Sequence, residues 1–179
     1  RADAHLYEHS LEVQLPFLQY PLGTDIRIVP IILGTQKAET CRVIASVLKP
    51  YLNAGNLFVI SSDFSHYPDY EDAIANDKTT ADAILTNSPD ALLKTLAAND
   101  DKGTPGLVTS LCGWTSVLTL MYMTEGSDVA YHEIDYRNSG DSPVYGDKDR
   151  VVGYFSIAVE DSRPEALQNG SSSYSPSSE

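Results

Sequence analysis

An acid and a histidine follow an apolar run near the middle of the chain. Asp63 and His66 lie three residues apart, directly after the apolar residues 57–60 and two serines. A carboxylate can orient an imidazole and stabilise its protonated form, so this pair can act as an acid and a base near neutral pH. A turn aspartate and a solvated histidine after a buried strand are the structural alternative, and the spacing alone leaves both interpretations open.

A second polar pair lies near the amino end. Glu8 and His9 precede the segment 11–18, whose leucines repeat at helical spacing and predict a short amphipathic helix. Pro16 is expected to kink or end this helix. Glu8 and His9 then lie at its amino end, either as functional groups or as a helix cap and a solvated histidine.

A single cysteine is expected near a helix start. The segment 107–123 predicts a helix that Thr109 or Ser110 caps, and Cys112 would then lie in or near its first turn. Backbone N–H groups and the helix dipole favour a thiolate at such a place. A buried structural cysteine is the alternative.

The elements that position these residues alternate in type. The β-branched runs 26–33 and 57–60 predict two strands, the second buried on both faces, and the apolar stripe over 37–52 predicts a helix between them. Such a βαβ unit has a right-handed crossover, and its sheet binds ligands at the carboxyl ends of the strands. The sequence therefore predicts an α/β fold with Asp63 and His66 at the ligand-binding edge.

The second half of the chain continues with helices and strands. Alternation along 129–136 places Tyr131 and Tyr136 on opposite faces of one strand, and 161–179 is expected to be a disordered tail rich in serine and proline. The predicted elements are helices over 70–85 and 88–98, capped by Ser88, and strands over 129–136 and 150–159.

The overall charge excludes several classes of partner. Twelve basic and 25 acidic residues give a net charge of −13, which argues against binding nucleic acid or anionic lipid. No apolar run approaches the roughly 18 residues of a membrane span, and no signal peptide is evident. Cys41 and Cys112 form no paired motif, which predicts a reducing, cytoplasmic location. The chain opens on Arg1 and not on methionine, as expected of a truncated or processed chain.

Four blocks of sequence together resemble one protein family. This family is the MEMO family, in particular its microbial branch, the AmmeMemoRadiSam system protein B. The resemblance runs from about residue 7 to 159. The blocks are EHSLEVQLP at 8–16, SSDFSH at 61–66, LCG at 111–113, and YRNSGD at 136–141 with VVGY at 151–154.

The resemblance implies a metal pocket. The MEMO family is similar to the LigB-class extradiol ring-cleaving dioxygenases, in which two histidines and a carboxylate hold Fe(II) at the strand ends of an α/β sheet flanked by helices. MEMO proteins place a cysteine at the third ligand position, and Cys112 matches it. The resemblance therefore implies that Cys112 binds iron or copper.

Other pocket residues match by position. His66 matches the acid/base histidine of the dioxygenases, His9 matches the histidine that faces the oxygen site, and Asp63 matches the pocket acid. We expect Glu8 and Ser62, which neighbour these residues, to contact the substrate.

The chain also departs from the family pattern. The two metal-binding histidines of the family lie in segments resembling H-A-G-Y and G-P-S-H, which do not occur here. His5 and His132 lie in other contexts. Residues 1–160 therefore resemble the carboxyl-terminal two-thirds of a MEMO domain, with a sheet that is incomplete at its amino end.

Three functions are compatible with these features. The first is a non-haem, metal-dependent oxidoreductase acting on a small molecule or a protein partner. The second is a non-catalytic module that binds a peptide or protein and keeps a vestigial metal site, and the third is an inactive partial domain. A serine hydrolase is disfavoured, because no G-x-S-x-G motif surrounds the serines near His66.

Overall fold

The chain folds into helices and strands, as the sequence predicts. The computed structural model describes residues 5–6 and 8–161 of the 179. The predicted tail from residue 162 onward lies outside the described residues. The elements are the helices α1 (Leu15–Leu22), α2 (Ala38–Leu48), α3 (Tyr70–Leu85), α4 (Pro89–Asp101) and α5 (Trp114–Thr124), the strands β1 (Val129–Asn138) and β2 (Gly153–Asp161), and the 3₁₀ turns η2 (Glu12–Gln14), η3 (Lys49–Tyr51) and η4 (Ser139–Asp141).

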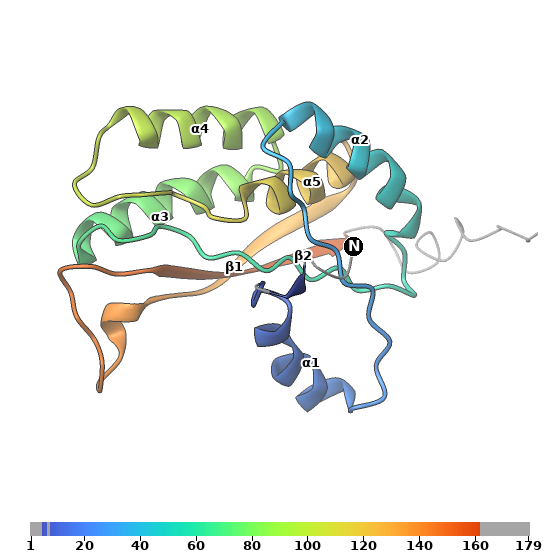
Figure 1. Cartoon of the computed structure of the whole chain (residues 1–179). Coiled ribbons are helices and arrows are strands. Elements are labelled where there is room, and N and C mark those ends of the chain that lie inside the picture. The colour runs from blue at the N-terminus through green and yellow to red at the C-terminus, as the bar shows by residue number, and fades with distance from the viewer. Residues whose placement is uncertain (1–4, 7, 162–179) are drawn as a thin grey trace, which may run out of the picture.

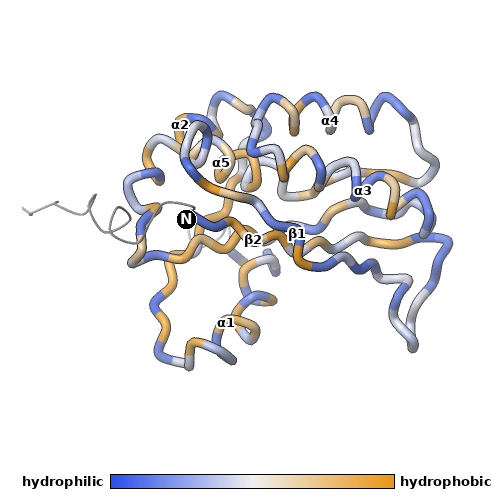
Figure 2. The backbone as a smooth tube through the Cα atoms, turned by 180° about the vertical axis from the view of Figure 1, so that it is seen from behind, coloured by the Kyte–Doolittle hydropathy of each residue, from blue (hydrophilic) through white to orange (hydrophobic). Residues whose placement is uncertain are grey.

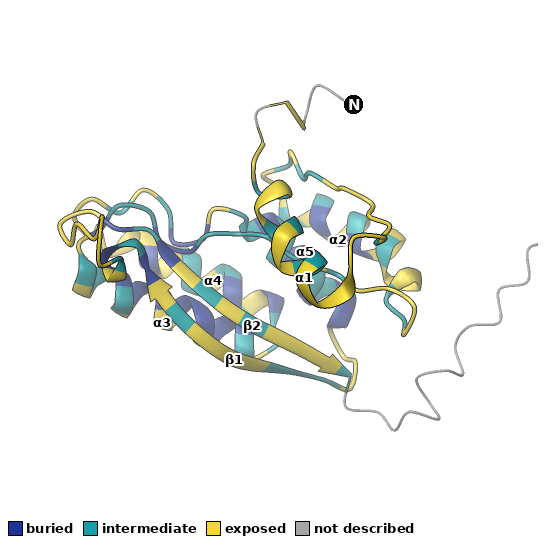
Figure 3. Cartoon of the chain, turned by 90° about the horizontal axis from the view of Figure 1, so that it is seen from below, coloured by how far each residue is buried: buried dark blue, intermediate teal, exposed yellow. Residues whose placement is uncertain are grey.

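A two-stranded antiparallel ribbon supports a layer of helices. Strands β1 and β2 pair along their length, and α2 to α5 lie on one side of them (Figure 1). The opposite face of the ribbon is largely exposed (Figure 3). The core fills the space between the ribbon and the helices. Its buried members are Cys41, Phe64, Ala81, Ile84, Leu92, Leu111, Leu118 and Met121.

A β-bulge changes which side chains of β1 face the helices. The pairing register shifts between Glu133 and Asp135, so Tyr131 pairs with Val159 and Tyr136 pairs with Phe155. Because Phe155 and Val159 share a face of β2, both tyrosines face the same side. The prediction that they lie on opposite faces is wrong, because strict alternation does not allow for the extra residue.

The predicted helices over 37–52, 70–85 and 88–98 are confirmed as α2 with η3, α3 and α4. The start of α4 follows the expected capping chemistry, since the Ser88 hydroxyl accepts a hydrogen bond from the Ala91 N–H at 3.3 Å and proline follows the cap. Pro16 does not end the amino-terminal helix. It lies in the first turn of α1, where no intrahelical N–H is needed, and α1 continues to Leu22.

The two apolar runs 26–33 and 57–60 are not strands. In the described part of the chain neither run pairs with another strand, so the predicted βαβ unit is absent. The side chain of Leu57 is 72% exposed, so the prediction of a run buried on both faces is also wrong. The run 26–33 lies in the connection from α1 to α2, whose apolar residues are visible in Figure 2. Among residues 5–6 and 8–161, no strand lies beside either run to pair with its backbone and cover its side chains.

A buried carboxylate joins α3 to strand β1 and to the segment that precedes His66. Asp77 is fully buried, and its carboxylate accepts hydrogen bonds from the Ser65 N–H at 2.8 Å and the Tyr136 hydroxyl at 2.9 Å. Burial raises the pKa of Asp77 above its ordinary value, and the hydrogen bonds partly oppose that change. Burial likewise raises the pKa of Tyr136. Asp77 therefore ties β1 and the segment before His66 to one helix.

Gly153 leaves room for this carboxylate. A Cβ atom at Gly153 would lie 1.7 Å from Asp77 Oδ2, so Gly153→Ala must displace the buried network. We expect a loss of about 1–3 kcal/mol in the free energy of unfolding, the usual cost of overpacking. Urea unfolding checks this. Gly34→Ala, where nothing lies within 4 Å of the added carbon, is the control and should change stability by less than about 0.5 kcal/mol. Equal losses in the two variants would contradict the role of Gly153.

The raised pKa of Asp77 predicts a pH-dependent stability. The folded state holds the Asp77 proton more tightly than the unfolded chain does, so this contribution is fully present below 3.8, the ordinary value, and is lost as pH rises through the folded-state pKa. Asp77→Asn removes the titration. The stability of the native protein relative to Asp77→Asn should therefore fall as pH rises above 3.8, in urea unfolding at a series of pH values. A difference that stays constant with pH would contradict this prediction.

Candidate functional site

Backbone hydrogen bonds hold the segment around His66 on both of its sides. The His66 N–H donates to the Thr109 carbonyl and its carbonyl accepts from the Val108 N–H, both at 2.9 Å. On the other side, the Phe64 N–H donates to the Gly153 carbonyl and the Gly153 N–H donates to the Ser65 carbonyl, also at 2.9 Å. The backbone that carries Asp63 and His66 is therefore fixed between two segments that are distant in sequence.

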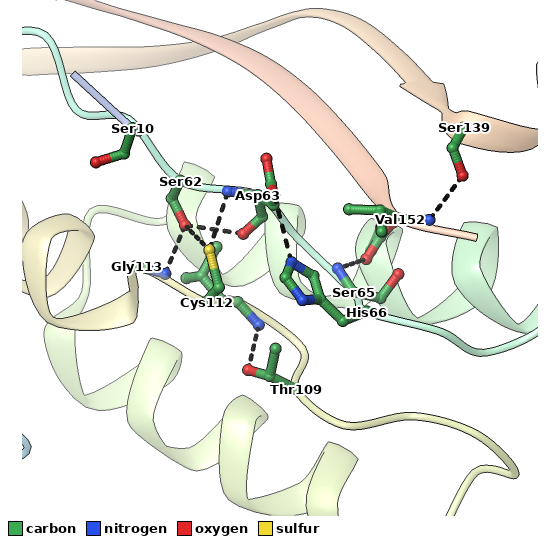
Figure 4. Close-up of polar contacts among 12 residues, drawn as sticks. Ser10, Ser62, Asp63, Ser65, His66, Thr109, Cys112, Gly113, Ser139 and Val152 are labelled. Atoms are coloured by element: carbon green, nitrogen blue, oxygen red, sulfur yellow. Dashed lines mark hydrogen bonds and ion pairs between the residues drawn. The ribbon is translucent and has the colours of Figure 1, made fainter. Parts of the chain in front are cut away.

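Three side chains with metal-binding atoms meet at this point. The ligand atoms of Asp63, His66 and Cys112 all lie within 4.8 Å of one another (Figure 4). His66 Nε2 lies 3.4 Å from Asp63 Oδ2. The Asp63 N–H donates to Cys112 Sγ at 3.3 Å, and the Cys112 N–H donates to the Asp63 carbonyl at 3.1 Å. The structure thus brings together three of the residues that the sequence singled out.

Cys112 lies two residues before helix α5, so it is near the first turn, as predicted, and not within it. Helix α5 begins at Trp114 with Gly113 at its N-cap, so the predicted helix over 107–123 is wrong in its first seven residues. The backbone from 108 to 112 is used instead for pairing with the segment 63–66. Ser110 does not cap a helix, because its hydroxyl is buried and donates to Asn76.

Ser62 lies between the segment that carries Asp63 and the segment that carries Cys112. Its hydroxyl accepts a hydrogen bond from the Gly113 N–H at 2.8 Å and lies 3.8 Å from Cys112 Sγ. A Cβ atom at Gly113 would lie 2.8 Å from the Ser62 side chain, so glycine permits this approach. The predicted contact of Ser62 with substrate stays a prediction, but the residue does lie beside the thiol.

The donor set fits a metal ion. His66 Nε2 is buried and has no hydrogen-bond partner among the described residues, and Asp63 Oδ2 lies 3.4 Å from it as a possible ion-pair partner when the imidazole is protonated. A buried polar atom normally has a partner, and a metal ion can supply one. Thiolate, imidazole and carboxylate are together suited to a transition metal, and the sulfur favours a soft or borderline ion.

Glu8 and His9 lie outside this three-residue group. Both are exposed, and His9 Nδ1 lies 2.7 Å from Glu12 Oε1. The Glu8 carboxylate accepts a hydrogen bond from the Ser10 N–H at 2.9 Å, which lowers the pKa of Glu8. Their roles stay predictions. His132 is an exposed strand residue whose Nε2 lies 3.6 Å from Glu160 Oε2.

Two residues near the site were missed by sequence reasoning. The Gln14 amide donates to the Ser61 hydroxyl at 3.0 Å and so holds the amino-terminal segment against the site. Burial raises the pKa of Tyr154, and the negative charge of Asp63 raises it further, so this phenol lies within electrostatic reach of the site. Gln14 lies in the block 8–16 and Tyr154 in the block 151–154. Their places in these family-like blocks could have indicated that they lie near the site.

An apolar cavity lies next to the site. It has a volume of about 90 Å³ and is lined by residues 60–64, among them Ser62 and Phe64, and by residues of α3, α5, β1 and β2. Ser62 therefore borders both the thiol of Cys112 and this apolar space.

The remaining sequence expectations concern location. Cys41 is buried, Cys112 is exposed and both are free thiols. None of the helices in the described ranges combines the length and apolar character that crossing a membrane requires.

Comparison with known proteins identifies the family. The family model described as Memo-like protein matches residues 1–158. A MEMO1 family protein of Thermoplasma acidophilum is 36% identical over 155 residues, which are 87% of this chain and 54% of the relative. One from Methanosarcina mazei is 38% identical over 162 residues, 87% of this chain and 56% of the relative.

The chain spans about half the length of the curated relatives it matches. Its mixture of helices and strands is consistent with the α/β fold expected from the resemblance. The family match covers every residue of the three-residue group, and it confirms the family predicted from the four sequence blocks. The chain belongs to the Memo-like family.

Proposed function

We propose that this protein binds iron or copper through Cys112, His66 and Asp63 and uses the metal in redox chemistry on a small molecule or a partner. The observation that carries the proposal is the meeting of three different donor atoms within 4.8 Å, one of them a buried imidazole nitrogen without a hydrogen bond. The resemblance to dioxygenases supports iron, and the thiol supports copper or iron over harder ions.

The protein's own residues hold and orient the site. Iron or copper would supply the ability to exchange single electrons with oxygen or a substrate. The backbone N–H of Asp63 donates a hydrogen bond to Cys112, and the Asp63 carboxylate lies beside His66. Moving one of these three residues should therefore shift the positions of the other two. The apolar cavity beside Ser62 can receive a nonpolar part of a substrate.

The amino-terminal segment completes the proposed substrate site. Gln14 anchors this segment to Ser61, so Glu8 and His9 are carried on a segment tied to the residues just before Asp63. We propose that both contact the substrate from this exposed position.

A non-catalytic binding module is the second candidate. Helix α1 buries no residue, and Phe17 and Tyr20 on it are exposed. Exposed aromatic residues on one short helix are a common feature of protein-binding surfaces. In this alternative the three-residue group is vestigial.

Metal titration decides between the two. We expect the chain to bind one Fe(II) or Cu(I) ion under anaerobic conditions, measured by competition with a chelator of known affinity. Cys112→Ala should weaken binding more than about 100-fold, because removing even a residue that supports a ligand costs roughly 10- to 100-fold. His66→Ala should have a comparable effect.

Matched variants of residues outside the group serve as controls. Cys41→Ala and His132→Ala remove the other free thiol and an exposed histidine, and both should bind metal as the native protein does. If His66→Ala keeps full affinity while Cys112→Ala loses it, His66 is not a ligand and is left with the acid/base role. Absence of stoichiometric binding by the native chain would refute the metal site and favour the binding module.

A further inference from the structure

The apolar cavity beside the candidate site is built from one face of the ribbon and one side of α5. Phe155, Ile157 and Val159 line it at every second position of β2, so their side chains share a face of that strand. Val117 and Leu120 line it from α5, where a spacing of three residues places them on the same side of the helix. Strand alternation and helical spacing therefore give the cavity two apolar walls.

The polar side chains that line this cavity already have hydrogen-bond partners. Ser62 and Tyr131 are the lining residues that carry a hydroxyl. The Ser62 hydroxyl donates to the Asp63 carbonyl and accepts from the Gly113 N–H, both at 2.8 Å. The Tyr131 hydroxyl lies 2.8 Å from that of Thr124. A buried water needs about two to four polar partners, so an apolar space whose hydroxyls are engaged elsewhere stays dry.

The volume of the cavity limits what it can hold. A water molecule occupies roughly 30 Å³ in the liquid, so a cavity of about 90 Å³ has room for a molecule of a few heavy atoms. Apolar cavities of about 150 Å³ admit benzene, and this one is smaller. The side chain of Val159, which lines the cavity, is 38% exposed and gives a small molecule a way in from solvent.

We propose that this cavity binds a small nonpolar molecule, dioxygen in the redox chemistry proposed above, and holds it beside Cys112. The Ser62 hydroxyl lies 3.8 Å from Cys112 Sγ, so the same side chain borders the cavity and approaches the thiol. Transfer of a nonpolar molecule from water to an apolar space is favourable. The identity of the ligand as dioxygen rests on the proposed function, whereas binding of a nonpolar molecule depends on the cavity alone.

Xenon and dioxygen are the probes, and both are applied to the metal-free full chain. Their binding is followed by NMR through the methyl resonances of Val117, Leu120 and Ile157. We expect these resonances to shift saturably as the xenon pressure rises. Dioxygen is paramagnetic, so it should also increase the relaxation rates of these methyl groups, and more than those of Val47, whose side chain is 64% exposed.

Matched variants test whether xenon binds in this cavity. Val117→Phe fills the space with a larger side chain and should abolish the xenon shifts of Leu120 and Ile157. Val47→Phe makes the same exchange at an exposed position of α2 and should bind xenon as the native protein does. Preserved chemical-shift dispersion shows that each variant is folded.

An enlarged cavity provides a second test that does not depend on the folding of Val117→Phe. Leu120→Ala removes the outer carbon atoms of one wall, so this variant should bind benzene, which the native cavity is too small to admit. Leu22→Ala makes the same exchange at a side chain that is 58% exposed and should not bind benzene. Equal responses of these two variants to benzene would contradict the cavity site.

The outcomes separate this inference from the proposed function. Cys112→Ala should bind xenon normally even if it has lost metal. Xenon binding without metal binding would keep the cavity site and refute the metal site, and metal binding without xenon binding would do the reverse. No saturable xenon shift, a dioxygen effect at Val117 no larger than at Val47, or full xenon binding by Val117→Phe would overturn the proposal.

Discussion

Pairing of the backbone on both sides of His66 is the constraint on which the candidate site depends. His66 bonds to Thr109 on one side, and on the other side its neighbours along the chain bond to Val151 and Gly153 at the start of β2. A slip of one residue in either pairing would turn Asp63 and His66 toward different neighbours. The same pairing directs the chain from 108 to 112 past Asp63, and so brings Cys112 to the two residues it meets. The positions of the three side chains thus depend on the register of these pairings. Helix α5 begins at Trp114, just after Cys112.

The buried carboxylate of Asp77 reinforces that register from the helical side. A carboxylate is costly to bury unless donors surround it. Ser65 and Tyr136 supply these donors from two different segments, and each loses its partner if the segments separate. Gly153 is part of the same arrangement, since any larger residue would occupy the place of the carboxylate. One charged group therefore links α3, β1 and the backbone before His66.

The sequence predicted much of this arrangement because the signals were local. Helical periodicity and the Ser88-Pro89 start located α2 to α4, and the four family blocks located Asp63, His66 and Cys112. Features that depend on distant partners were not predicted. Leu57 and its neighbours have the composition of a buried strand, but burial requires a neighbouring strand. The bulge at Ile134 and the late start of α5 follow from pairing between remote segments.

The unpaired apolar runs lead to an expectation about the molecule in concentrated solution. Val29 and Leu57 are exposed in runs that belong to no helix or strand, and exposed, unpaired apolar backbone can pair with another copy. The net charge of −13 opposes that contact by mutual repulsion between molecules. Repulsion of this kind acts over a Debye length of about 30 Å at 0.01 M salt and only about 3 Å at 1 M. We therefore expect light scattering to show particle size increasing with sodium chloride concentration.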